Sequence, residues 1–147
     1  PAARIDDVAI FDSAAIIQHL VRRFGPGTLT LVDHDDIGSR NFTTVTDGAL
    51  DALINAFYLA KDGVLPAQAS YVEKQLARAA SAMTWLDARV AEAPHALEHF
   101  GLPAIALYTS IDWMRFRKAY DVEQHAAIAR FMTVHAARES VAATDPR

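Results

Sequence analysis

Cysteine is absent from the 147 residues, which excludes disulfides, thiolate metal sites and a cysteine nucleophile within this chain. No apolar run reaches the roughly 18 residues that span a bilayer, and no charged-then-apolar signal pattern opens the sequence. The net charge of -4 comes without any basic stripe, which argues against nucleic-acid binding. Together these absences predict a cytoplasmic protein whose partners include neither a membrane nor a nucleic acid.

The length and composition are those of an ordinary folded domain. A chain of 147 residues is long enough to bury a core. Its hydrophobic fraction of 52% and charged fraction of 22% are normal for globular proteins. Alanine is frequent, and alanine favours helix. We therefore expect a helix-rich domain.

The first 27 residues predict a hairpin followed by a helix. Residues 3–5 and 8–11 are prone to form strands, and Asp6 and Asp7 supply turn chemistry between them. An isolated hairpin is only marginally stable, so we expect it to need further strands. Asp12-Ser13 opens a helix, because either side chain can accept hydrogen bonds from first-turn amides. Gly25-Pro26-Gly27 ends that helix.

Four more helices are predicted over about residues 35–62, 67–92, 102–118 and 122–137, followed by short turns in 138–147. The second is the clearest, because its apolar residues alternate at spacings of four and three. That is the seam of a helix packed nearly antiparallel to a neighbour. The seam residues are Val72, Leu76, Ala79, Met83, Leu86 and Val90. The order of elements supports an α+β or mostly α architecture.

Five segments, in order, carry motifs that occur together in one known family. Residues 1–16 have a proline at the start of a strand, a hairpin, and an acidic residue plus serine opening a Ser-x-x-Ile helix. Leu29-Thr30-Leu31 follows as a linker, and Asp-Gly-Ala-Leu-Asp-Ala at 47–52 lies in a long helix. Ile-Ala-Leu with Asp-Trp-Met-Arg-Phe-Arg at 105–117 and Arg-Glu-Ser-Val with Thr-Asp-Pro at 138–146 complete the set. Together they resemble the glutathione S-transferase superfamily, bacterial cytosolic type.

The resemblance implies a mostly α fold in two parts. Residues 28–147 would form the family's all-helical C-terminal domain, and residues 1–27 the β-hairpin and helix that end its thioredoxin-like, glutathione-binding domain. The first half of that domain has no counterpart here, so we expect the chain to be a fragment of a longer protein. In the family that half carries the Tyr, Ser or Cys that activates the glutathione sulfur. No residue of this sequence is assigned that role.

The resemblance also implies a glutathione site at Pro1, Asp12 and Ser13. An acidic side chain suits the ammonium of the γ-glutamyl end, and a hydroxyl with helix-start amides suits its carboxylate. The alternative is that Ser13 only caps its helix. Pro1 matches the family's cis-proline, but a cis bond needs a preceding residue, so that role cannot be realised in the chain as it stands.

Glutathione would act as co-substrate, with no prosthetic group. Its thiolate would attack a small hydrophobic electrophile, the usual chemistry of an activated sulfur nucleophile. By helix position alone, Asn41, Val45, Tyr108 and Trp113 are the candidates for the electrophile pocket, and ordinary core packing is the alternative for each. Family members form twofold homodimers, so the resemblance also implies a homodimer.

Two other functions compete with transfer of glutathione. The same fold can serve as a non-catalytic binding or assembly module, because folds host varied functions. A zinc hydrolase is suggested by His95-Ala96-Leu97-Glu98-His99, which matches the short pattern His-x-x-Glu-His. That pattern follows Pro94 in an expected loop, and no third ligand is evident, so we interpret it as coincidence and expect no metal site.

Overall fold

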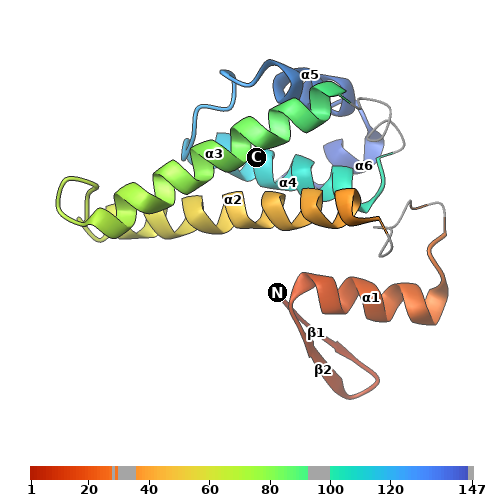
Figure 1. The fold of residues 1–147 in the computed structure, drawn as a ribbon. Helices are drawn as coiled ribbons and strands as arrows, with labels where there is room; N and C mark the ends of the chain where they lie inside the picture. Colours follow the sequence, from red (N-terminus) through yellow and green to blue (C-terminus); the bar gives the residue numbers. More distant parts are fainter. Residues whose placement is uncertain (28, 30–35, 93–99, 146–147) are drawn as a thin grey trace.

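A computed structural model describes residues 1–27, 29, 36–92 and 100–145 (Figure 1). The mostly helical fold class with a hairpin at the amino-terminal end is confirmed. In chain order the elements are β1 (Ala2–Ile5), β2 (Val8–Phe11), α1 (Ser13–Phe24), α2 (Ile37–Lys61), α3 (Ser70–Glu92), α4 (Leu102–Arg117), α5 (Ala126–His135) and α6 (Glu139–Ala142).

The hairpin forms as predicted. β1 and β2 pair antiparallel, with Ala2 opposite Phe11 and Ile5 opposite Val8. The two turn residues, Asp6 and Asp7, have φ of 49° and 63°. Two left-handed residues in a two-residue loop make the turn that matches the twist of paired strands, and aspartate tolerates this conformation. Arg23 of α1 forms an ion pair with Asp6, which joins the helix to the turn.

The helices from α2 onward form a bundle around one hydrophobic core. In Figure 1, α2 and α3 lie side by side as long antiparallel helices, with α4 and α5 packed against them. The predicted seam of α3 is confirmed, because five of its six residues are buried and Leu76 is partly buried. α4 contributes Ala104, Leu107, Ile111 and Met114 to the same core.

Two predicted helix boundaries are wrong, because local hydrogen bonds hold the chain in turns instead. α3 begins at Ser70 rather than near residue 67, where the Gln68 side chain accepts a hydrogen bond from the amide of Leu65 at 2.8 Å. α5 begins at Ala126 rather than near residue 122, where the Asp121 carboxylate accepts from the amide of Glu123 at 3.2 Å. Side chains that bond nearby backbone groups compete with helix.

Gly48, in the middle of α2, leaves room for the Arg78 side chain of α3. A Cβ built at this position would lie 3.1 Å from the Nη2 atom of Arg78. The guanidinium therefore rests on the helix where the glycine leaves room.

None of the helices in the described ranges is long and apolar enough to cross a bilayer.

Candidate functional site

The start of α1 brings Pro1, Asp12 and Ser13 together. The Asp12 amide donates to the Pro1 carbonyl at 3.1 Å, which ties the first residue of the chain to the beginning of the helix. The Asp12 carboxylate accepts from the Ala14 amide at 2.9 Å, so Asp12 is the N-cap. The Ser13 hydroxyl donates to the same carboxylate at 3.4 Å. All three residues are exposed and accessible to a ligand.

This arrangement resolves which residue caps the helix. Asp12 performs that function, and Ser13 is the first helical residue. The first amides of a helix have no intrahelical acceptor. Because Asp12 satisfies only Ala14, the amides of Ser13 and Ala15 are the remaining donors of the first turn. Such donors, at the positive end of a helix dipole, suit a carboxylate.

Asp12 also carries backbone strain. Its φ of 73° with ψ of 144° is unusual for a residue other than glycine. Residues in sparsely populated conformations of this kind cost about 1–3 kcal/mol, and they concentrate at ligand-binding and switch positions. In this conformation the Asp12 carboxylate caps the first turn of α1.

A second carboxyl group, Asp47 of α2, belongs to the surroundings of this site. Partial burial of the carboxyl group contributes most to raising the pKa of Asp47 above its ordinary value, and the negative charges of Asp51 and Asp12 raise it further. Asp12 is therefore near enough to α2 for its charge to act on Asp47. A ligand ammonium would be attracted to this concentration of negative charge.

The sequence interpretation missed Asp47 as a site residue. The available signal was the pair Asp47 and Asp51, four residues apart and therefore on one face of a helix. Both residues lie in the motif at 47–52 that carries part of the family resemblance. Nothing in the sequence showed that the face would lie toward the start of α1.

The proposed electrophile residues fall in three places. Tyr108 and Trp113 line a cavity of about 500 Å³ between α4 and α6. Val45 lines a shallower hollow of about 350 Å³ between α2 and α3, together with Arg78 and Trp85. Asn41 is exposed near the beginning of α2. The structure thus brings Tyr108 and Trp113 together and leaves Val45 and Asn41 apart from them.

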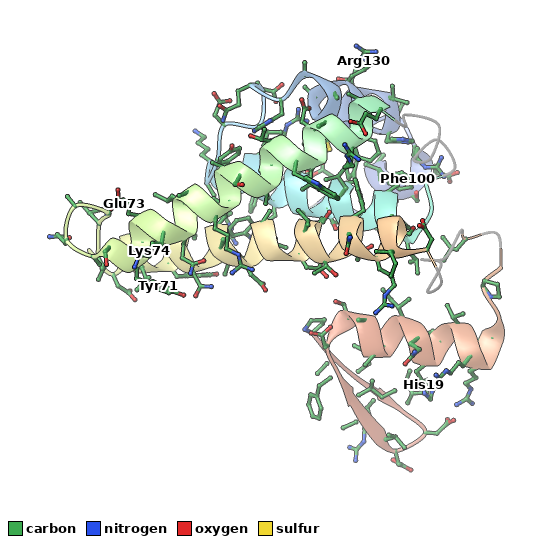
Figure 2. All side chains as sticks on the ribbon, in the orientation of Figure 1. His19, Tyr71, Glu73, Lys74, Phe100 and Arg130 are labelled. Carbon is green, nitrogen blue, oxygen red and sulfur yellow. The ribbon has the colours of Figure 1, made fainter. Side chains whose placement is uncertain are left out.

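The cavity between α4 and α6 has aromatic side chains at four of its eleven described lining residues. Its ring-bearing walls are Phe100, Tyr108, Trp113 and Phe116. Phe100 is buried and lies beside α6 (Figure 2), with its ring edge-on to that of Tyr108 at a centroid distance of 5.8 Å. Rings at this distance and angle attract each other.

Metal binding finds no support in the described residues. Across the ranges that the structure describes, no group of three His, Asp or Glu side chains lies close enough together to hold an ion. The pattern from His95 to His99 lies outside the described residues, so the structure does not bear on it.

Three solved structures share this fold. A glutathione transferase family member from Pseudomonas fluorescens Pf-5 with bound S-(propanoic acid)-glutathione matches 100% of this chain and 76% of its own at a TM-score of 0.79 and 22% identity. A second structure of a glutathione transferase family member from Pseudomonas fluorescens Pf-5, with bound glutathione, matches 100% of this chain and 73% of its own at the same TM-score and identity. A glutathione S-transferase from Methylobacillus flagellatus KT with glutathione bound matches 97% of this chain and 72% of its own, also at 0.79 and 22%.

These matches show that the chain has the glutathione transferase fold. They span the hairpin, α1 and the helical bundle together, because the two Pseudomonas structures cover the entire chain. Neither a protein-family model nor a curated protein sequence matches it. The fold predicted from the sequence motifs is therefore confirmed by the structural similarity.

Proposed function

We propose that this chain binds glutathione at the start of α1, with the Asp12 carboxylate receiving the γ-glutamyl ammonium. The hydroxyl of Ser13 and the amides of Ser13 and Ala15 would hold the γ-glutamyl carboxylate. The observation that carries the proposal is the capped, strained helix start, where Asp12 and Ser13 are exposed and Pro1 is bonded alongside. Similarity over the full chain to structures that hold glutathione supports it.

The reaction that this site favours is transfer of glutathione to a small hydrophobic electrophile. The thiol would lose its proton, the thiolate would form a bond to an electrophilic carbon, and that carbon would release its leaving group. The activating Tyr, Ser or Cys is not assigned to any of the 147 residues, so the proposal of catalysis names no thiol-activating group. We retain Asn41, Val45, Tyr108 and Trp113 as the proposed electrophile residues.

The same proposal assigns residues 1–27 to the end of a glutathione-binding domain and residues 28–147 to a helical C-terminal domain. A homodimer and a cytoplasmic location are part of it. Glutathione is the thiol that keeps the cytosol reducing, so a glutathione-dependent protein would find its co-substrate there.

Calorimetric titration of the full chain with glutathione tests the site. We expect Asp12→Asn and Ser13→Ala each to weaken binding by about fivefold to tenfold, since each removes a charge-assisted or polar contact. Asp62→Asn, on the exposed end of α2, is the matched control and leaves the affinity unchanged. The dipeptide Cys-Gly lacks the γ-glutamyl group, so it should bind neither the unsubstituted chain nor either variant. Equal affinities of all variants would refute the proposed site.

A non-catalytic binding module remains the second candidate, and one observation favours it. No thiol-activating residue is assigned beside the Asp12–Ser13 site. A conjugation assay with 1-chloro-2,4-dinitrobenzene separates the two candidates, because a module binds glutathione without turnover. Conjugation that Asp12→Asn and Ser13→Ala both reduce would support transfer by the chain itself.

A further inference from the structure

The outer edge of β2 presents unpaired backbone groups. The Asp12 amide donates to the Pro1 carbonyl, so the backbone of Asp12 points toward the β1 side. Backbone direction alternates along a strand, so Ile10 also points toward β1, whereas Ala9 and Phe11 point outward. Across the described ranges the sheet has two strands, and no further strand pairs with this edge. A row of unpaired backbone groups is a template for another strand.

β2 lacks the features by which edge strands avoid pairing. Such strands commonly carry a charge, a proline or a bulge. β2 is Val-Ala-Ile-Phe and pairs with β1 residue for residue, whereas β1 carries Arg4 at the opposite edge. Val8, Ala9 and Phe11 are exposed. The hairpin packs mainly against α1, on the side of that helix away from the bundle (Figure 1), so a partner can approach β2.

A second copy of β2 is complementary to this edge. In an antiparallel pair with a twofold axis, Ala9 of each copy would lie opposite Phe11 of the other, and their outward backbone groups would all be paired. The small side chain of Ala9 would leave room for the ring of Phe11. The two copies of Ile10 would lie opposite each other on the more buried face of the hairpin.

Charge and width are both compatible with this pairing. The register that sets Ala9 opposite Phe11 also sets Asp12 opposite Val8 and Asp7 opposite Ser13, so no carboxylate would face another. Like charges directly opposite would be unfavourable. Two strands are about 9.5 Å wide and a helix is about 10 Å in diameter, so the α1 helices of two copies fit side by side on one face.

We propose that two copies of the chain pair through β2, antiparallel and related by a twofold axis, so that their hairpins form one continuous sheet. Strand addition of this kind draws its affinity from main-chain hydrogen bonds and its register from side chains. So short a strand buries little surface, so the dimer is weak and forms reversibly. The proposal assigns a surface to the homodimer and stands whether or not the chain binds glutathione.

Amide hydrogen exchange of the unsubstituted chain, followed by NMR, tests the pairing. From about 10 μM to about 1 mM protein, exchange at Ala9 and Phe11 should slow by roughly tenfold, because their amides become hydrogen-bonded in the dimer. The amides of Ala2 and Arg4 point outward at the opposite edge and are the matched control, with no change expected. Exchange at Ala9 and Phe11 that is independent of concentration would overturn the proposal. Equal slowing at Ala2 and Arg4 would do the same.

Single-cysteine variants report the contact directly, because the chain has no cysteine of its own. In Ile10→Cys the two copies would form a pair without hydrogen bonds between them, with Cα atoms about 4.5 Å apart, which a disulfide can bridge. We expect a covalent dimer on mild oxidation. Ala3→Cys is the matched control, since Ala3 lies opposite Ile10 on β1 and is also partly buried. Two intervening strands would separate its copies, so it should stay monomeric.

The pattern of crosslinking decides between the two edges. A covalent dimer of Ala3→Cys without one of Ile10→Cys would place the contact at the β1 edge and overturn the proposal. Equal crosslinking of both variants would also overturn it, because random collision gives that result. Circular dichroism of the reduced variants shows whether each is folded. If either is not, the exchange measurement on the unsubstituted chain decides the question.

Discussion

The hairpin with α1 and the bundle from α2 to α6 differ in how far their side chains are buried. Every buried residue in the described ranges lies at Thr46 or later, and α1 has none. In the hairpin and α1, Phe11 and Phe24 each expose 70% of their surface. In the bundle, Leu53, Met83 and Leu107 expose 1% or less. Most of the hydrophobic stabilisation therefore belongs to the bundle.

The proposed glutathione site lies in the less buried of these two parts. Pro1, Asp12 and Ser13 lie in the part with little burial, and hydrogen bonds at the helix start hold them together. Binding elements are commonly drawn from the less stable parts of a protein. A carboxylate in the bundle, Asp47, also contributes to the electrostatics of the site. The site is thus held locally by hydrogen bonds, while the like charges of Asp12 and Asp47 oppose each other.

The largest expected difference in stability is between substitutions of two leucines, one buried in the bundle and one in α1. Leu107→Ala removes a side chain with 0% exposure and should destabilise the protein by about 2–5 kcal/mol, because it leaves a cavity. Leu20→Ala, at 39% exposure, should cost less than about 1 kcal/mol. Urea denaturation followed by circular dichroism measures both. Equal losses would contradict the division between the two parts.

A smaller effect is expected at a cap that joins two helices of the bundle. The Asp87 carboxylate of α3 accepts hydrogen bonds from the amides of Ala127 and Ile128 at 2.9 and 3.0 Å, at the start of α5. Asp87→Ala should cost about 1–2 kcal/mol of unfolding free energy, as other lost caps do. Asp87→Asn should retain most of that stability, since asparagine is also a good cap. A loss as large for asparagine as for alanine would show that the cap is not the cause.

Gly48→Ala tests the room that Gly48 leaves for the Arg78 side chain. Alanine in place of a mid-helix glycine should stabilise the protein by about 0.5–1 kcal/mol. The nearest obstacle is the end of the Arg78 side chain, which is exposed and can move. Arg78→Ala in the same background removes that obstacle and serves as the control. Thermal unfolding measures both. If Gly48→Ala destabilises the protein only when Arg78 is present, the guanidinium cannot move aside for the added methyl group.

The smallest effect concerns the charge that links the two parts. Because the pKa of Asp47 is raised in the folded state, the folded protein holds this proton more tightly than the unfolded chain does. The contribution of Asp47 to stability therefore falls as the pH rises from 3.8, the ordinary pKa of the group, through its raised pKa in the folded state, and it recovers on acidification. Asp47→Asn should be slightly more stable than the parent at pH 7, by less than about 0.5 kcal/mol, and not at pH 3.

Carbon-detected NMR titration of the Asp47 carboxyl sharpens the same point. Asp12→Asn should lower the pKa of Asp47 toward its ordinary value, because it removes one of the two negative charges that raise it. Asp62→Asn should leave that titration unchanged. A pKa of Asp47 indifferent to Asp12 would show that the two parts are not electrostatically coupled.

Several elements could be predicted because their cause lies within a few residues. The hairpin follows from two aspartates between short β-prone runs, and the helices follow from apolar spacing. The boundaries of α3 and α5 were missed because turn hydrogen bonds by Gln68 and Asp121 compete with helix at those positions. At the candidate site, residue types indicated Asp12 and Ser13, and the structure decided which of them caps the helix.

By itself the sequence determined the hairpin, the presence of helices α1 to α5, the seam of α3 and the pairing of acid and hydroxyl at the start of α1. The starts of α3 and α5 and the short helix α6, where turns were expected, came from the structure. Only the tertiary structure decided that Asp87 would cap a helix 40 residues away, that Asp12 would influence Asp47, and that Tyr108 and Trp113 would share one cavity. Local hydrogen bonds and apolar periodicity act over one or two helical turns. Over that length the spacing of residues in the sequence determines which of them share a face. Charge interactions, distant caps and cavities depend on how whole helices pack, and a single linear pattern does not contain that arrangement.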